Sequence, residues 1–379
     1  MPQSWIEHRV FQIIFATGIL SDTTESTILI MKLKFARYDL NFKVPGGTSR
    51  GVLNTKETYF IKIENEGSTG IGEVGLFRGL SHDDRPDFEA RLAWLSGNIE
   101  KGKAWCMERL KDYPSILFGL EQAFLSLEAP SMFELYPSEF TRGANSIPIN
   151  GLVWMGDKEF MQSQIRNKLN DGFGVIKLKI GAIDFDAEMD LLGSIRKNFS
   201  AEEIEIRVDA NGAFSPGEAM EKLKRLSEFE IHSIEQPIRQ GQLEKMAQLC
   251  GESPVPIALD EELIGLTDAI AREELLKHVK PQYLIFKPSL VGGIKVCNHW
   301  IDLCHKYDVG WWITSALESN IGLNAIAQYT YTLDNTMPQG LGTGGLFTNN
   351  IPSPLRVDQG ALYYDPNLKW GNTDRLFAE

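Results

Sequence analysis

The chain has 379 residues, 43% of them hydrophobic and 23% charged, a composition typical of a globular protein with a large core. Its formal net charge is −13 and its pI is near 5.1, so we expect neither nucleic acid nor an anionic membrane surface as a partner. No run reaches the ~20 apolar residues of a membrane-spanning helix, and the four cysteines form no CxxC pair, which predicts reduced thiols in a cytoplasmic protein.

The first 30 residues stand apart from the rest of the sequence. Residues 10–20 are fairly apolar, but Gln12 and Thr17 interrupt the run and no A-x-A cleavage site follows it. We therefore interpret residues 1–30 as a disordered leader or the product of a misplaced start codon. Met31 then opens a credible strand, because apolar and charged residues alternate after it.

Residues 31–140 predict an α+β unit, in which strands are followed by helices. Two strands within 31–64 flank a loop at 43–51, whose glycine, proline and serine content is typical of a flap over an active site or of a long hairpin turn. A third strand is predicted at 70–76. The predicted helices cover 87–98, 103–111 and 115–128.

From about residue 146, short β-branched runs alternate with helical stretches, which indicates βαβ units and a parallel sheet. We expect an α/β fold, a TIM-like (β/α)7β barrel over 141–345 behind an N-terminal α+β capping domain, with 346–379 packing back on the cap. A doubly wound open sheet is the runner-up, but no GxGxxG follows the first strand. The predicted strands are 147–153, 175–180, 205–208, 233–235, 256–258, 283–286, 310–314 and 337–340.

An ionisable residue lies at the end of each of five consecutive predicted strands, at intervals of one βα unit. Equivalent positions on neighbouring barrel strands meet at the C-terminal rim, where barrel active sites are built. A single residue of this kind is usually a solvated rim residue or a helix N-cap, but an ordered series indicates a catalytic site. The series is Lys177, Lys179, Asp209, Glu235, Asp260 and Lys287.

Three adjacent carboxylates cannot all stay ionised without a counterion, and a hard divalent cation supplies one. We expect Mg²⁺, with Mn²⁺ as a substitute, because no His or Cys that would favour zinc falls in the series. Lys177 and Lys179 share one strand face. Their mutual repulsion and desolvation are expected to lower a lysine pKa towards neutrality, which would provide a general base.

These residues resemble the muconate-lactonising subgroup of the enolase superfamily, whose sites pair a lysine base with Mg²⁺. The resemblance covers about 31–365. It implies that Asp209, Glu235 and Asp260 bind the metal and that Lys179 and Lys287 form the acid/base pair. It also implies that Lys177 tunes Lys179, with Asn211, Glu261 and Arg207 as supports. The matching segments are 177–179, 207–212, 234–237, 259–261 and 286–288.

Three further segments, at 150–153, 314–322 and 340–344, resemble the o-succinylbenzoate synthase family. The resemblance implies a small carboxylate substrate, 2-succinyl-6-hydroxycyclohexa-2,4-diene-1-carboxylate, which is dehydrated in menaquinone biosynthesis. Lys179 would remove the proton and then protonate the departing hydroxyl, while Lys287 would stabilise the enediolate as a cation. The residues implied in substrate binding are Thr48, Ser49, Arg50, Gly292, Ser315 and Gly344.

Two alternatives remain open. A dipeptide epimerase or N-acylamino acid racemase shares the metal and the lysines, but an epimerase must also hold a substrate ammonium, and residues 335–357 contain no Asp or Glu. That absence does not exclude N-acyl substrates. A barrel that only binds metal would be expected to have lost one of the key residues, and none is missing. Both a monomer and an oligomer are compatible with the sequence.

Overall fold

The computed structural model describes residues 31–48 and 51–378, so the leader predicted at 1–30 and the predicted substrate contacts Ser49 and Arg50 lie outside the described residues. All four cysteines are buried and free, as predicted. Among the described residues, no helix has both the length and the apolar character needed to cross a membrane.

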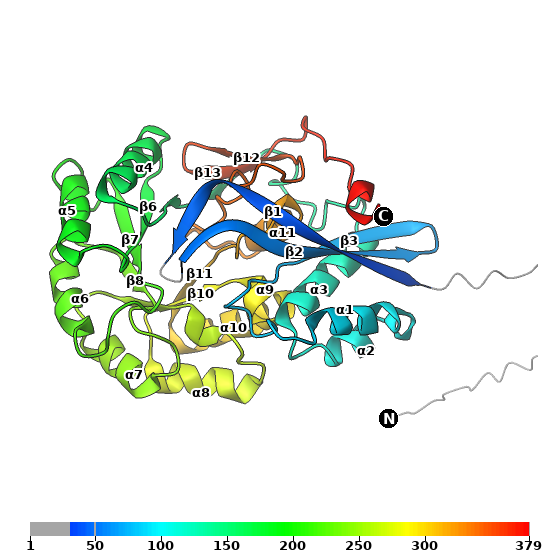
Figure 1. Cartoon of the computed structure of the whole chain (residues 1–379), viewed down its shortest axis with the longest axis horizontal. Coiled ribbons are helices and arrows are strands. Elements are labelled where there is room, and N and C mark those ends of the chain that lie inside the picture. Colours follow the sequence, from blue (N-terminus) through cyan, green and yellow to red (C-terminus); the bar gives the residue numbers. More distant parts are fainter. Residues whose placement is uncertain (1–30, 49–50, 379) are drawn as a thin grey trace, which may run out of the picture.

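The N-terminal part of the described chain is an antiparallel sheet covered by helices (Figure 1). The sheet has the order β1-β2-β3, and α3 packs closely on β3, because a Cβ on Gly72 would lie 2.1 Å from the carbonyl oxygen of Gly119. These elements confirm the predicted strands-then-helices pattern. They are β1 (Lys32–Thr48), β2 (Gly51–Asn65), β3 (Ser68–Val74), α1 (Phe88–Ser96), η1 (Ile99–Lys101), α2 (Lys103–Glu108) and α3 (Pro114–Glu128).

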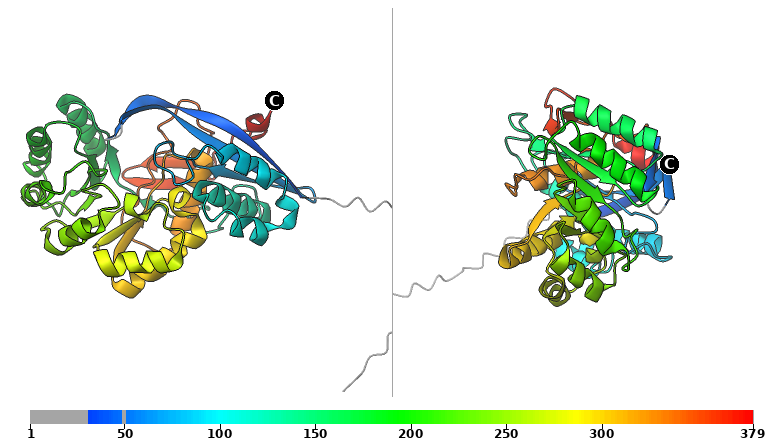
Figure 2. Two further views of the ribbon diagram at one scale, coloured as in Figure 1. Left: turned by 60° about the horizontal axis from the view of Figure 1, so that its bottom comes forward. Right: turned by 90° about the vertical axis from the view of Figure 1, so that its left-hand side faces the viewer.

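The loop predicted at 43–51 is wrong in extent, because β1 continues to Thr48 and β2 begins at Gly51. The pairing register of the two strands shifts between Asn41 and Gly46, so the hairpin is irregular here. We call residues 40–48, which include the Gly/Pro-rich stretch, the cap arm. The arm is held by another part of the chain, since Lys43 N donates to Leu346 O at 2.8 Å. Figure 2 shows the arm reaching from the helical layer of the cap across one end of the parallel sheet.

The second part of the chain is a curled seven-stranded parallel sheet in which strand order follows chain order, from β5 to β11. This uniform order excludes the doubly wound alternative, in which the order reverses at a switch point. The strands are β5 (Gly151–Val153), β6 (Val175–Lys179), β7 (Glu205–Asp209), β8 (Ser233–Glu235), β9 (Ile257–Leu259), β10 (Tyr283–Phe286) and β11 (Gly310–Ile313).

Helices lie on the outside of the curl (Figures 1 and 2). Their inner faces and the outward faces of the strands form one large buried apolar cluster. The helices are α4 (Lys158–Asn170), α5 (Phe185–Arg196), α6 (Ala219–Ser227), α7 (Leu243–Glu252), α8 (Ala269–Val279), α10 (Ile294–Tyr307) and α11 (Asn320–Tyr331), with the short η2 (Glu261–Leu263) and α9 (Pro288–Val291) at the strand ends.

The two edges of the curled sheet are joined by the segment predicted as an eighth strand. Gln339 forms a parallel bridge with Ile149, and Gly340 forms one with Thr314. Gly340 N also donates to Ile313 O at 2.8 Å, so the segment bonds to both edges. It contributes isolated bridges rather than a regular strand. The chain then ends in β12 (Leu355–Asp358), β13 (Ala361–Tyr364), which pairs with β4 (Ile147–Pro148), and η3 (Asp374–Phe377).

Buried carboxylates of the cap hold the N-termini of two helices of the second part. Glu73 of β3 is fully buried and accepts hydrogen bonds from Ser319 N and Gly322 N, both at 2.9 Å, where α11 begins. Glu121 of α3 accepts from Ile294 N at 2.5 Å and Lys295 N at 3.2 Å, where α10 begins. Both carboxylates satisfy amides that a helix end would otherwise leave unpaired.

Glu121 makes the stability of the fold depend on pH. Burial raises the pKa of Glu121 from 4.5 to about 7, so the folded state binds this proton more tightly than the unfolded chain. Its stabilising contribution is therefore complete below about pH 4.5 and is lost as the pH rises towards 7. Relative to Glu121→Gln, the wild type should lose about 2 kcal/mol of unfolding free energy between pH 5 and pH 8. Urea unfolding of both proteins measures this, with Glu128→Gln at the exposed end of α3 as the control; a pH-independent difference would contradict it.

Candidate active site

The predicted ionisable residues lie side by side at the C-terminal ends of neighbouring strands. The pairing register sets Lys179 of β6 opposite Asp209 of β7, and Asp209 opposite Glu235 of β8. Asp260 follows β9 directly, and Lys287 follows β10 as the N-cap residue of α9. The parallel arrangement therefore carries the whole series to one end of the curl.

Each lysine ammonium is paired with at least one carboxylate. Lys177 Nζ lies 3.0 Å from Asp209 Oδ2 and also bonds to Glu235. Lys179 Nζ donates to Asp209 Oδ2 at 2.9 Å. Lys287 Nζ bonds to Asp260 and lies 3.5 Å from Glu235 Oε1. The three carboxylate residues are at most 2% exposed, so these ion pairs are screened little by solvent.

The ion pairs shift lysine pKa values in the direction opposite to the one predicted. Burial alone would lower the pKa of Lys177, but the charges of Asp209 and Glu235 outweigh it and raise that pKa. Burial likewise opposes the charged form of Lys287, yet Asp260 and Glu235 raise its pKa. For Lys177, then, the expectation of a pKa lowered towards neutrality is wrong in this arrangement, because attraction to the carboxylates exceeds repulsion between lysines.

Burial and ion pairing act in opposite directions on the carboxylates as well. Burial would raise the pKa of Asp209, but the ammonium groups of Lys177, Lys179 and Lys287 hold it well below its usual range. The pKa of Asp260 is raised well above its usual value, chiefly by burial.

The predicted supports Asn211 and Glu261 lie within this cluster. Asn211 Oδ1 accepts from Lys179 Nζ at 2.8 Å, and Asn211 Nδ2 donates to Glu261 Oε1 at 3.1 Å. Asn211 adopts a left-handed φ of 44°, a conformation that tolerates few side chains and recurs at functional sites. A single amide therefore links the lysine on β6 to the acidic segment after β9.

Gln236 also supports the cluster, although only its sequence motif had drawn attention to it. It is fully buried, and its Oε1 accepts from Asp260 N and Glu262 N, both at 3.3 Å. Its φ of 41° is left-handed, like that of Asn211. Gln236 thereby ties the end of β8 to the backbone that carries Asp260.

Arg207, the third predicted support, lies deeper in the curl on the same face of β7 as Asp209. Its guanidinium bonds to Glu205 Oε1 at 2.6 Å and to Pro338 O at 2.9 Å, and it stacks over Trp312 at 4.4 Å. These contacts join β7 to the segment that closes the sheet. Arg207 therefore braces the floor beneath the cluster.

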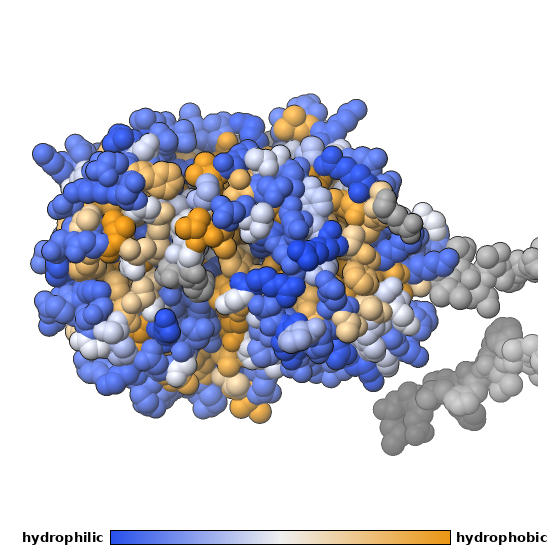
Figure 3. Space-filling view, viewed as in Figure 1, coloured by the Kyte–Doolittle hydropathy of each residue, from blue (hydrophilic) through white to orange (hydrophobic). Residues whose placement is uncertain are grey.

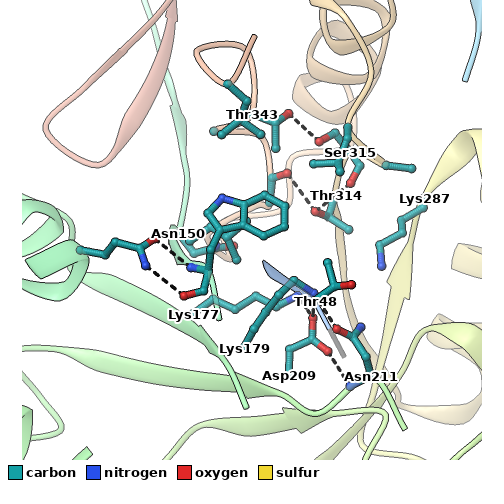
Figure 4. A pocket seen from close by; sticks show the side chains of 18 of the residues that line it. Thr48, Asn150, Lys177, Lys179, Asp209, Asn211, Lys287, Thr314, Ser315 and Thr343 are labelled. Carbon is teal, nitrogen blue, oxygen red and sulfur yellow. Dashed lines mark hydrogen bonds and ion pairs between the residues drawn. The ribbon is translucent and has the colours of Figure 1, made fainter. Parts of the chain in front are cut away.

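A cavity of about 390 Å³ opens above the cluster (Figure 4). The three lysines, Asp209 and Asn211 supply polar groups to its lining, and apolar side chains supply much of the rest. Cavities of this size with a few converging polar groups are typical of small-molecule sites. The apolar lining comprises Phe77, Leu80, Leu152, Trp154, Phe173, Leu290, Ala316, Leu317 and Leu346.

The predicted substrate contacts are only partly brought together. Thr48 and Ser315 line the cavity, whereas Gly292 and Gly344 are not among the described residues that line it. Ser315 Oγ is 2.6 Å from Thr343 Oγ1, so the two hydroxyls form one polar strip in the wall. Thr343 itself lies within a segment singled out by resemblance, but its side chain was not predicted to line the site.

The side chains fit a hard divalent cation in their chemistry. In the part of the chain that the structure describes, no three His, Cys, Asp or Glu side chains already converge as a metal site, because the ammonium groups of Lys177 and Lys287 bridge the carboxylates. The donors are nevertheless three buried carboxylates on consecutive strands, which are the ligands that Mg²⁺ prefers. Asp209, Glu235 and Asp260 would hold such an ion.

The parallel sheet is curled and has helices on its outside, and lysines and carboxylates lie at the C-terminal ends of its strands. This arrangement defines a TIM-like α/β protein with an acid–base site. A family model described as Enolase C-terminal domain-like matches residues 161–367, and the chain belongs to this family.

Similarity to known proteins extends over most of the chain. It is 49% identical over 363 residues to the o-succinylbenzoate synthase of Desulfotalea psychrophila, covering 88% of this chain and 98% of the relative. The crystal structure of MenC from Desulfotalea psychrophila LSv54 superimposes with a TM-score of 0.78 at 45% identity, covering 88% and 99% of the two chains. An N-succinylamino acid racemase of Amycolatopsis sp. is 26% identical over 342 residues, covering 87% and 91%.

Proposed function

We propose that the protein is a lyase that dehydrates 2-succinyl-6-hydroxycyclohexa-2,4-diene-1-carboxylate to o-succinylbenzoate, in the cytoplasm and as a step of menaquinone biosynthesis. The observation that carries the proposal is the 49% identity, over 88% of this chain, to an o-succinylbenzoate synthase. The three lysines that line the cavity support it, because proton removal beside a carboxylate needs a base and a cationic environment. We expect no nucleic acid or membrane partner.

Lys179 would act as the base. Its Nζ lies at the cavity and is held by Asp209 and Asn211, so its position is fixed by hydrogen bonds at 2.9 and 2.8 Å. In its neutral form it would take the proton from the ring carbon that bears the carboxylate. The electron pair left behind forms the new ring double bond as the C6–O bond breaks. Lys179 then returns the proton to the departing hydroxyl, and water leaves.

Lys287 would act as a fixed cation at the same cavity. Asp260 and Glu235 raise its pKa, so it stays protonated while Lys179 exchanges a proton. Its charge would stabilise the negative charge that proton removal places on the substrate carboxylate. Mg²⁺, or Mn²⁺ in its place, held by Asp209, Glu235 and Asp260, would bind that carboxylate and share in the stabilisation.

We also propose a division of the chain that matches this function. Residues 141–345 would form a (β/α)7β catalytic barrel, residues 31–140 a capping domain, and residues 346–379 a segment that returns to the cap. The separate apolar clusters of the cap and of the barrel support the division. The cavity lies between them, since Phe77 and Leu80 line it from the cap side.

Turnover of the cyclohexadiene substrate tests the function. Purified protein with Mg²⁺ should remove the diene absorbance, and a sample treated with EDTA should not. A folded protein that binds Mg²⁺ but leaves the absorbance unchanged would contradict the proposal.

A racemase acting on N-succinylamino acids is the second candidate. The similarity to the Amycolatopsis racemase favours it, and two lysines on opposite sides of one cavity suit a two-base reaction. Exchange of the α-proton of an N-succinylamino acid in D₂O, without turnover of the cyclohexadiene, would make this the leading function.

A further inference from the structure

Trp154 stands where the cap, the barrel and the cavity meet. It follows β5, it is 9% exposed, and its side chain lines the cavity. It packs in one apolar cluster with Leu40 of the cap arm and with Leu317 beyond β11. A large flat side chain therefore forms part of the apolar lining of the cavity that the lysines also line.

The main chain of Trp154 is clamped by the side-chain amide of Gln164, which lies two turns into α4. Trp154 N donates to Gln164 Oε1 and Gln164 Nε2 donates to Trp154 O, both at 2.9 Å. Only a group that donates and accepts at once can make this pair of bonds, and a glutamine amide does so. The clamp fixes where the indole stands relative to β5.

The hairpin arm of the cap lies directly on Trp154. A Cβ on Gly46 would come within 3.1 Å of Cζ3 of the indole, and a Cβ on Gly47 within 2.1 Å of Met155 O. Met155 N in turn donates to Gly47 O at 3.3 Å. Neither glycine has a positive φ, so close approach, and not backbone conformation, explains why a side chain is absent at both positions.

These contacts give the cavity a wall made jointly by both parts of the chain. Phe42 of the arm meets the indole edge-on at 6.3 Å, which adds a second aromatic contact. The lysines line the same cavity, so a flat ring bound there would have the indole as part of its apolar surroundings.

We propose that Trp154 is a specificity-determining residue whose indole forms the wall for the substrate ring. Gln164 is its positioning residue, and Gly46 and Gly47 allow the cap arm to close the cavity against it. The inference rests on the proposed function, because the cyclohexadiene ring is the group that such a wall would recognise.

Steady-state kinetics of the full chain with saturating Mg²⁺ test the inference. Trp154→Phe keeps a flat ring and should raise KM about fivefold with kcat little changed. Gln164→Met removes both clamp bonds at nearly constant volume and should give a similar rise. Gly47→Ala should lower kcat/KM about fiftyfold, because the cap arm could not pack on the barrel without displacing the main chain of Met155. The matched controls are Gln162→Met on the same helix and Gly345→Ala, whose Cβ meets nothing within 4 Å.

A double-mutant cycle separates positioning from general damage. If Gln164 acts through Trp154, then Gln164→Met added to Trp154→Phe should raise KM by clearly less than it does in the wild type. Fully additive effects would show that Gln164 acts elsewhere and would overturn its assigned role.

The outcomes distinguish this inference from the proposed function. If the wild type converts the cyclohexadiene and the kinetic constants of all three variants lie within twofold of its own, the role assigned to Trp154 is disproved. The proposed function is then unaffected. If the wild type instead racemises N-succinylamino acids, the same variants are measured with N-succinylphenylglycine, which also carries a ring. An unchanged KM there would overturn the wall as well, and a raised KM would support it.

Discussion

Replacing Lys179 by alanine should lower kcat for dehydration by about a thousandfold or more, while the protein stays folded and still binds Mg²⁺. A positioned general base typically contributes about 10²–10⁴ in rate, and here the same nitrogen serves as base and then as acid. Asn211 and Asp209 hold that nitrogen at the cavity, so its removal takes away a base whose position is fixed. Steady-state kinetics and Mg²⁺-dependent thermal unfolding measure the two parts of the prediction.

Lys179→Arg distinguishes proton transfer from charge. Arginine keeps the cation but cannot be deprotonated in a protein, so this variant should be as inactive as Lys179→Ala. Lys245→Ala, on the exposed face of α7, is the surface control. Substantial turnover by Lys179→Arg would show that the residue acts as a cation and that the base is another group.

Lys287 should respond differently, because its proposed role needs only a positive charge. Lys287→Arg is expected to retain more dehydration activity than Lys287→Ala, since a guanidinium can stabilise negative charge. In a two-base racemase, Lys287→Arg would lose activity as completely as Lys287→Ala. The comparison therefore separates the two candidate functions at a single position.

The series of ionisable residues could be predicted because it depends on local regularity. In a parallel barrel each βα unit returns the chain to the same end, so a residue at the end of one strand lies beside its equivalent on the next. The register that sets Lys179 opposite Asp209 and Glu235 one strand further follows from that repetition. The strand bounds needed for the argument are correct to within one or two residues.

The contacts between side chains could not be predicted, because they join residues whose separation in the sequence follows no regular repeat. Whether Lys177 is neutralised by carboxylates or repelled by Lys179 depends on distances across two strands, and the ion pairs prevail. The link from Glu73 of the cap to Ser319 spans 246 residues. Residues 46–48 are strand rather than loop because they pair with the start of β2 after a shift in register, and a bond from Lys43 to Leu346 also holds this stretch.

Glu235→Gln should abolish the stabilisation of the fold by Mg²⁺. In the wild type, Mg²⁺ at 100 times its Kd should raise the free energy of unfolding by about 2.7 kcal/mol. Glu235 lies between Asp209 and Asp260 and is 2% exposed, so removing its charge takes the central ligand from the proposed set. Urea unfolding with and without Mg²⁺ measures this without any reference to activity.

The same variant should also be less stable than the wild type before Mg²⁺ is added. Glu235 bonds to Lys177 and approaches Lys287, so its neutralisation leaves two buried ammonium groups with fewer counterions. Breaking a buried ion pair in this way costs about 3 kcal/mol. Glu244→Gln, whose side chain is 87% exposed on α7, should show neither effect.

A Mg²⁺ response in Glu235→Gln equal to that of the wild type would place the metal elsewhere. Loss of the response together with lower metal-free stability would mean that one carboxylate serves the lysines when the ion is absent and the ion when it is bound.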